Sequence, residues 1–194
     1  MYFITSNKGK INSLQNYLKD FGCLIEVKQK TIELPEIQAD SVLDISRAKA
    51  KAAFLKLKHP LVVEDGGFCV EALNNFPGVY VRYILDTIGA EGLLQLMKNQ
   101  ENRNCRFVSV ATFVDAEGNL TSFTREGGSG KMTREMDMTD CPHAWSDIWR
   151  IYEVIEFGKT LSALNEEELR EHRLNAKESK SSLRLFAEWY SENY

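Results

Sequence analysis

The chain opens, at residues 1–14, with the stretch MYFITSNKGKINSL. Its first apolar residues, Tyr2–Ile4, predict a short strand. A polar, basic turn, Thr5–Lys10, leads directly into a helical pattern that extends from Lys10 to Phe21. A strand that passes through a short turn into a helix is typical of an α/β protein, and the rest of the chain extends this pattern.

Strand and helix signals alternate through the first half of the chain. Leu24–Val27 predicts a second strand, and a helix capped by Asp40 or Ser41 is expected up to Leu57. The apolar stripe of that helix is expected to contain Val42, Ile45, Ala48, Ala52 and Leu55. The continuous apolar run Leu61–Val63 then predicts a buried central strand that ends at the polar sequence 64–67.

In the second half of the chain, the spacing of apolar residues changes from a helical period to a strand period. Val81–Lys98 reads as helical with a break near Gly89, and the strands Arg106–Val114 and Leu120–Arg125 flank a turn that contains glycine. Ser181–Tyr190 predicts a last amphipathic helix. We therefore expect an α/β fold with a mixed β-sheet flanked by helices, rather than a purely parallel sheet.

Composition limits the classes of function. The 194 residues, 43% of them hydrophobic, fit one large domain or two closely joined lobes. A net charge of −4 provides no basic field for nucleic acid, so a small ligand is expected. No apolar run approaches the length of a membrane span and no signal peptide is evident, so we expect a cytoplasmic protein without a membrane partner. Four scattered cysteines and three histidines indicate free thiols rather than a zinc site.

Three acidic residues stand where strands and loops are expected to end. Glu36 lies in an extended loop, while Glu64 and Asp65 follow the buried strand. Ligands of open α/β sheets bind beyond the carboxyl ends of strands, and carboxylate oxygens suit Mg²⁺, which substrate phosphates and waters complete. A carboxylate there can also orient or deprotonate a water. The alternative is that Asp65 simply caps a turn with Gly66.

The opening turn has the complementary charge. Backbone N–H groups at a strand-to-helix junction favour an anion, and the helix dipole adds to this preference. The side chains that contribute donors or positive charge are Thr5, Ser6, Asn7, Lys8 and Lys10. Lys49 and Arg82 are candidates to complete a cationic site. The alternative is an ordinary capped helix start with solvated lysines.

Five motifs in order and spacing resemble the inosine triphosphate pyrophosphatase family. They are Thr5, Asn7 and Lys10 of a TxNxxK turn, Leu34–Glu36 of an LPE loop, Lys49 of a KA-rich helix, Val63–Gly67 of VEDxG, and Pro77–Tyr80 of PGxY. The resemblance spans nearly the whole chain. It implies hydrolysis of non-standard purine nucleoside triphosphates such as ITP, dITP and XTP to the monophosphate and pyrophosphate. It also implies an elongated fold of two lobes with a central cleft, and a homodimer.

The resemblance also implies roles for individual residues. The triphosphate would be held by Thr5, Ser6, Asn7, Lys10, Lys49 and Gly66, with Arg82 as a further cationic contact. Mg²⁺ would be bound by Glu36 and Asp65 with Glu64 beside them, and Asp65 would be the catalytic carboxylate. Of the two lysines in the opening turn, Lys10 is favoured over Lys8 for the phosphate contact.

The base-reading motifs depart from the family pattern. No intact FGxDP segment exists; in the nearest stretch, 141–149, Trp145 would stack on the purine and Asp147 would be the acidic partner. Of a KNxxSHR segment, His172 and Arg173 remain, whereas Glu167 and Glu171 replace the lysine and the serine. A carboxylate in place of a cation or a donor alters base selectivity. Two hypotheses follow: a Mg²⁺-dependent pyrophosphatase with shifted selectivity, and a nucleotide-binding protein with little turnover that acts as a sensor or interaction module.

Overall fold

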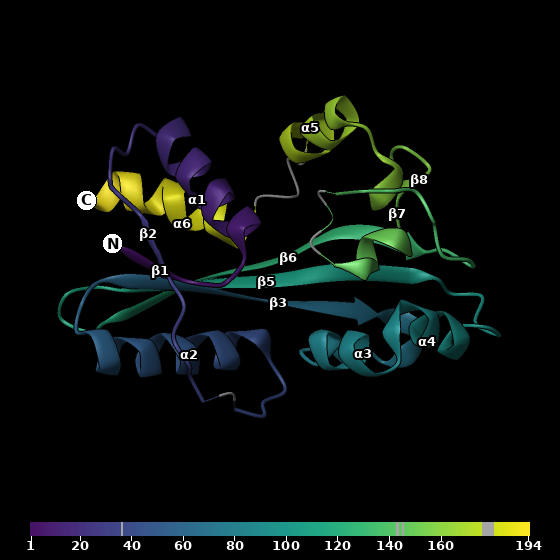
Figure 1. Ribbon diagram of the computed structural model, residues 1–194, viewed down its shortest axis with the longest axis horizontal. Coiled ribbons are helices and arrows are strands. Elements are labelled where there is room, and N and C mark those ends of the chain that lie inside the picture. The colour runs from purple at the N-terminus through teal and green to yellow at the C-terminus, as the bar shows by residue number, and fades with distance from the viewer. Residues whose placement is uncertain (36, 143, 145, 176–180) are drawn as a thin grey trace. The chain divides into compact units, whose positions relative to one another are not determined.

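The computed structural model describes residues 1–194 except 36, 143, 145 and 176–180, and it does not describe the side chains of 173–175 (Figure 1). It divides into two compact units. Unit 1 comprises Met1–Gly66, Ser109–Arg125 and Lys180–Tyr194, and unit 2 comprises Gly67–Val108 and Glu126–Ser179.

The strands and helices alternate along the chain. The strands are β1 (Tyr2–Ile4), β2 (Lys28–Lys30), β3 (Leu61–Val70), β4 (Pro77–Gly78), β5 (Asn104–Val114), β6 (Leu120–Met132), β7 (Tyr152–Val154) and β8 (Lys159–Thr160). The α-helices are α1 (Lys8–Asp20), α2 (Val42–Leu57), α3 (Val81–Thr87), α4 (Gly89–Leu96), α5 (Glu166–Asn175) and α6 (Ser182–Asn193). Short 3₁₀ helices are η1 (Glu71–Leu73), η2 (Asp147–Arg150) and η3 (Leu161–Ala163).

The strands form a mixed sheet. Their hydrogen-bonded order is β2-β1-β3-β5-β6-β7-β8, and β4 pairs with β3. β1 is parallel to both β2 and β3, whereas β7 is antiparallel to both β6 and β8. The sequence prediction of a mixed sheet flanked by helices is therefore confirmed. The expected two lobes with a central cleft, and the elongated shape, stay predictions.

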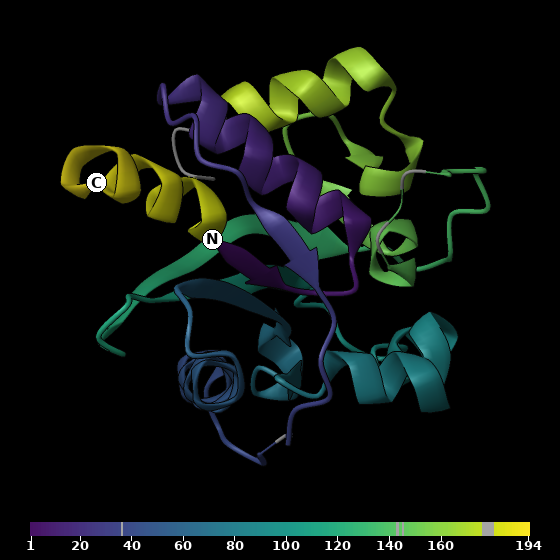
Figure 2. The same ribbon diagram turned by 60° about the vertical axis from the view of Figure 1, so that its left-hand side comes forward.

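Unit 1 has a core on each face of its strands. On one face, α1 and α6 pack side by side, and on the other face lies α2 (Figures 1 and 2). The alternation of strand side chains assigns successive residues of β3 to opposite faces. Val62 packs with the α1 and α6 core, whereas Leu61 and Val63 pack with Ala50 and Ala53 of α2.

Two strand predictions about unit 1 were wrong. The second strand is Lys28–Lys30, not Leu24–Val27, because β1 pairs through Tyr2 with Lys28, and Leu24 is 95% exposed. β3 does not end at Val63 but continues to Val70. Both errors arose because apolar composition alone decided where a strand was placed.

The buried stripe of α2 was also predicted incorrectly. Its buried residues are Val42, Ser46, Ala50 and Ala53, whereas Leu55, expected inside, is 59% exposed. Small side chains allow the helix backbone to lie close to the sheet, so size and not hydrophobicity selects this face.

Unit 2 is built around an aromatic core. Phe68, Phe107 and Tyr152 have ring centroids 4.8–6.3 Å apart. Trp149 is 8% exposed and packs in the same core. Gly130 of β6 lies under the Tyr152 ring, where any Cβ would overlap it, so part of the glycine-rich segment serves close packing.

Several expected elements of the second half are present, although β6 extends beyond the predicted end at Arg125 to Met132. The helical stretch 81–98 forms α3 and α4 with the break at Gly89, and β5 and β6 form the expected hairpin with Gly118 at φ +91°. All four cysteines are free thiols, and burial raises the pKa of Cys105 to about 12. Among the described residues, no helix has the length and hydropathy needed to cross a membrane.

Candidate active site

The turn after β1 is a capped helix start. Asn7 Oδ1 accepts hydrogen bonds from the backbone N–H groups of Gly9 and Lys10, at 2.8 and 3.2 Å. Thr5 Oγ1 in turn accepts from the Asn7 N–H at 3.1 Å. The cap that the alternative interpretation expected is therefore present. The lysines differ, because Lys8 is exposed whereas Lys10 points into an ion pair.

Strand β2 anchors the first residue of this turn. The Thr5 N–H donates to Lys30 O at 3.2 Å, and the Gln29 side-chain amide donates to Thr5 O at 3.0 Å. The sequence interpretation missed Gln29 because it placed the strand at 24–27. Gln29 lies between two lysines, and a short polar run with lysines is typical of an edge strand. The sequence interpretation did not use this signal.

The two adjacent acidic residues of β3 point to opposite faces of the sheet. Glu64 shares the face of Val62 and meets Lys10 of α1, and its Oε2 lies 2.5 Å from Lys10 Nζ. Asp65 shares the face of Val63, and its Oδ1 lies 2.6 Å from Lys49 Nζ of α2. The last parallel pair between β1 and β3 is Ile4 with Val63, so both carboxylates lie just beyond the carboxyl end of β1.

These ion pairs are mostly removed from solvent. The side chains of Glu64 and Asp65 are 10% and 15% exposed, and those of Lys10 and Lys49 are 23% exposed each. At such low exposure, opposite charges interact more strongly than surface pairs do. Unit 1 thus gathers four of the predicted site residues in two lysine–carboxylate pairs.

The carboxylate of Asp65 fits a metal ligand. Its Oδ1 accepts from Lys49, but its Oδ2 is buried and has no hydrogen-bond partner among the described residues. An unpaired buried carboxylate oxygen is costly, and Mg²⁺ prefers such oxygens. Glu36, the other expected ligand, lies outside the described residues. Within the described ranges, no three His, Cys, Asp or Glu side chains gather closely enough to hold a metal ion.

Helix α2 is fixed to β5 by buried hydroxyl groups. Ser46 Oγ donates to Val110 O at 3.2 Å and lies 2.9 Å from Thr112 Oγ1, and both hydroxyl residues are 0% exposed. Ser46 precedes Lys49 by one helical turn, so this anchor fixes the position from which Lys49 reaches Asp65. The sequence interpretation missed Ser46; its signal is a polar residue within the small-residue stripe.

The remaining site residues of unit 1 are polar and accessible. Ser6 and Gly66 are exposed, and Thr5 and Asn7 are partly buried. The structure therefore brings the Thr5–Lys10 turn, Lys49 and Asp65 together within one unit.

Of the predicted residues of unit 2, Arg82 and Asp147 have local contacts, whereas His172 contacts a different segment. Arg82 is 88% exposed and lies 3.7 Å from Asp86, four residues on. Asp147 begins η2, is 69% exposed and lies 3.6 Å from Arg150. His172 of α5 lies 3.9 Å from Glu156 and packs edge-on against Phe157. Trp145 and the side chain of Arg173 lie outside the described residues.

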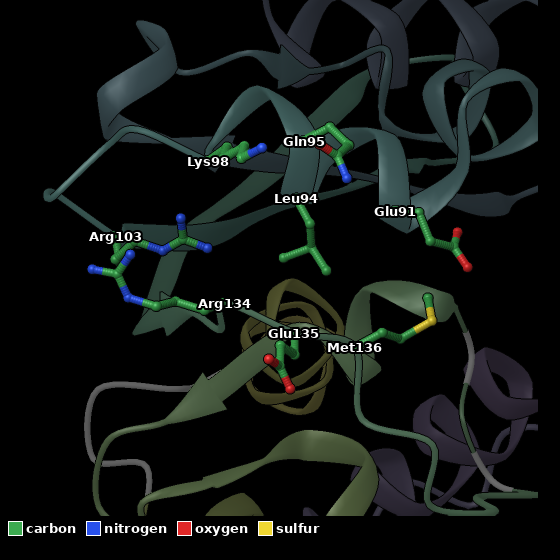
Figure 3. A pocket seen from close by; sticks show the side chains of 8 residues that line it. All are labelled: Glu91, Leu94, Gln95, Lys98, Arg103, Arg134, Glu135 and Met136. Carbon is green, nitrogen blue, oxygen red and sulfur yellow. The ribbon is translucent and has the colours of Figure 1, made fainter.

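Unit 2 also holds a cavity of about 480 Å³ that contains none of the predicted site residues. Figure 3 shows Arg103 and Arg134 at one end of it and Glu91 and Met136 at the other. The Arg103 guanidinium donates to the backbone carbonyls of residues 97, 132 and 133, so it serves the structure of the wall.

The sequence as a whole identifies the family. A family model described as the Ham1 family matches residues 1–179. The chain belongs to the Ham1 family. This agrees with the resemblance to inosine triphosphate pyrophosphatases that the motifs indicated.

Two named relatives match this Ham1 chain over different shares of its length. It is 33% identical to the dITP/XTP pyrophosphatase of Thermococcus kodakarensis over 98% of this chain and 97% of that protein. It is 40% identical to the dITP/XTP pyrophosphatase of Methanopyrus kandleri, over 64% of this chain and 65% of that protein, just under two thirds of its length. A solved Ham1 protein from Coxiella burnetii shares the fold, with a TM-score of 0.79 at 17% identity over 98% of each chain.

Proposed function

We propose that this Ham1-family chain is a nucleoside triphosphate pyrophosphatase. It hydrolyses non-standard purine nucleoside triphosphates, such as dITP and XTP, to the monophosphate and pyrophosphate. The observation that carries the proposal is the placement of Lys10 and Lys49 against Glu64 and Asp65, just beyond the carboxyl end of β1. The names of the Thermococcus and Methanopyrus relatives support the same reaction.

The opening turn and the two lysines bind the triphosphate. Phosphoryl transfer needs positioning and charge stabilisation more than a covalent nucleophile. The Thr5–Lys10 turn lies at the N-terminus of a 13-residue helix, where the dipole favours an anion, and Asn7 fixes its backbone. Lys10 and Lys49 supply the positive charge.

Asp65 is the carboxylate that acts in the reaction. It orients the attacking water and accepts its proton; the water oxygen bonds to the α-phosphorus, while the anhydride bond between the α- and β-phosphates breaks and pyrophosphate leaves. The buried, unpaired Oδ2 of Asp65 and the expected ligand Glu36 are the residues that would hold Mg²⁺. When bound there, Mg²⁺ would neutralise charge on the phosphate oxygens.

The base is read by residues of unit 2 in this proposal. Trp145, Asp147, His172 and Arg173 are the residues that the resemblance assigns to this role, and Arg82 is a further phosphate contact. The proposal includes a homodimer, which the family resemblance implies.

A substrate panel tests the proposed activity. The purified protein is incubated with Mg²⁺ and equal concentrations of ITP, dITP, XTP, ATP and GTP, and pyrophosphate release is measured. We expect the highest kcat/KM for one of the non-standard purines and no release without Mg²⁺. Tight binding of every nucleotide with no product would support the sensor hypothesis instead.

A further inference from the structure

The two adjacent carboxylates of β3 have different partners because they face opposite sides of the sheet. The assignment is consistent along the strand, since Val62 and Glu64 face α1 whereas Val63 and Asp65 face α2. Because successive side chains of a strand point to opposite faces, the two carboxylates do not lie side by side. Glu64 Oε2 and Asp65 Oδ2 both lack a hydrogen-bond partner among the described residues, but Glu64 Oε2 lies 2.5 Å from Lys10 Nζ, whereas Asp65 meets Lys49 through its other oxygen, Oδ1. The two carboxylates therefore are not equivalent, although their sequence positions made both candidates for the metal.

Glu64 is paired with Lys10 in the structure. Lys10 Nζ lies 2.5 Å from Glu64 Oε2 and also donates to the backbone carbonyl of Glu64 at 3.4 Å. The two residues are 54 positions apart in the chain, and the Glu64 side chain is 10% exposed. The fold thus holds the ammonium group of a phosphate-binding lysine on a carboxylate.

We infer that Glu64 is the counter-ion of Lys10 rather than a metal ligand, and that anionic phosphate competes with Glu64 for Lys10. This inference rests on the proposed function, which assigns Lys10 to the triphosphate. Glu64 is a positioning residue: it holds Lys10 beside the capped turn and weakens the attraction of Lys10 for free pyrophosphate. The consequence of this weaker attraction is that the product pyrophosphate dissociates more easily.

The test measures binding without turnover. Inorganic pyrophosphate is titrated by calorimetry into the full chain in EDTA, with wild type, Glu64→Gln, Lys10→Met and the double variant. We expect Glu64→Gln to bind pyrophosphate about fivefold more tightly, because a neutral amide no longer holds the ammonium. In the Lys10→Met background, the same substitution should change the affinity by less than about twofold.

Matched variants distinguish the loss of the Glu64–Lys10 pair from a general change of charge. Asp20→Asn removes one exposed carboxylate from α1, and Lys8→Met removes the exposed lysine of the same turn. Asp20→Asn should leave the pyrophosphate affinity unchanged, and Glu64→Gln should still tighten binding in the Lys8→Met background. Thermal melting of each variant confirms that it is folded.

A second measurement addresses the metal. Mn²⁺ binding, followed by water proton relaxation, should be retained in Glu64→Gln within about threefold and lost by more than about tenfold in Asp65→Asn. Equal loss in both variants would overturn the inference, because Glu64 would then be a ligand.

The binding results also overturn the inference if Glu64→Gln binds pyrophosphate no more tightly than wild type. They do so as well if its gain persists without Lys10. Failure of the proposed function is separate: it shows as absence of pyrophosphate release in the substrate panel, whatever these binding measurements give.

Discussion

The lysine–carboxylate pairs of unit 1 differ from the ion pairs of Arg82 and Asp147 in unit 2. In unit 1, Lys10 and Lys49 pair with carboxylates 54 and 16 residues away, and no side chain of these pairs is more than 23% exposed. In unit 2, Arg82 and Asp147 pair with residues four and three positions away, and they are 88% and 69% exposed.

The difference shows which residues the fold itself positions. A mostly buried pair between distant segments forms only when the tertiary structure is formed, so the fold itself sets the geometry of the pair. An exposed pair within one helical turn contributes about 0–1 kcal/mol and fixes little. Unit 1 therefore fixes the residues that we propose bind phosphate and metal, whereas Arg82 and Asp147 of unit 2 are free to adopt other contacts.

The largest expected effect is that of Asp65→Asn. If Asp65 activates water as proposed, removing its carboxylate should lower kcat by about a hundredfold or more. Steady-state kinetics on the best substrate of the panel, with saturating Mg²⁺, measure it. Asn is similar in size, so the Tm should change little. An unchanged kcat would mean that Asp65 is not the catalytic carboxylate.

Lys49→Met should have the next largest effect. Loss of a charge-assisted contact of about 1.5–3 kcal/mol predicts a drop in kcat/KM of about 10- to 100-fold. Lys51→Met is the matched control, because Lys51 is exposed on the same helix and should leave kcat/KM unchanged. Equal effects of the two substitutions would mean that only the net charge of α2 matters.

Asp137→Asn tests stability in unit 2 rather than chemistry. Burial raises the pKa of Asp137, but hydrogen bonds from Thr139, Thr160 and Ser162 outweigh it and hold the pKa below its usual value of 3.8. The stabilisation is therefore present above the unfolded-state pKa and is lost as pH falls through the lower folded-state pKa.

Denaturant unfolding measures this effect. At pH 7, Asp137→Asn should lower the free energy of unfolding by about 1–3 kcal/mol, and below about pH 3 the difference from wild type should shrink. The kcat of the folded variant should stay within about twofold of wild type. A difference that grows on acidification would contradict the assigned hydrogen bonds.

The smallest effect is expected for Arg82→Gln. Because the Arg82–Asp86 pair is exposed, the Tm should not change, while KM should rise about two- to fivefold if Arg82 contacts the triphosphate. Asp86→Asn, which removes only the local partner, is the control and should not raise KM. An unchanged KM in Arg82→Gln would remove Arg82 from the substrate site.

The sequence predicts elements best where one strong local signal defines them. Asn7 caps α1 and Gly118 allows the β5–β6 turn, and both elements form as expected. β2 was missed because Lys28–Lys30 is an edge strand. Its lysines protect it from pairing with other chains, but they also remove the apolar pattern by which a strand is predicted.

The site was predictable in composition but not in orientation. The motifs selected Lys10, Lys49, Glu64 and Asp65, and the structure pairs all four. That Glu64 and Asp65 face opposite ways depends on β3 continuing through Gly66, where glycine suggested an end. Ser46 was missed because its role depends on the contact between α2 and β5, which no local pattern encodes.

The most direct test of the central claim is a ³¹P NMR time course of dITP with the wild-type protein and Mg²⁺. The account predicts deoxyinosine monophosphate and pyrophosphate in equal amounts, with no orthophosphate formed. Release of orthophosphate and the diphosphate, or a spectrum that remains that of dITP, would contradict it.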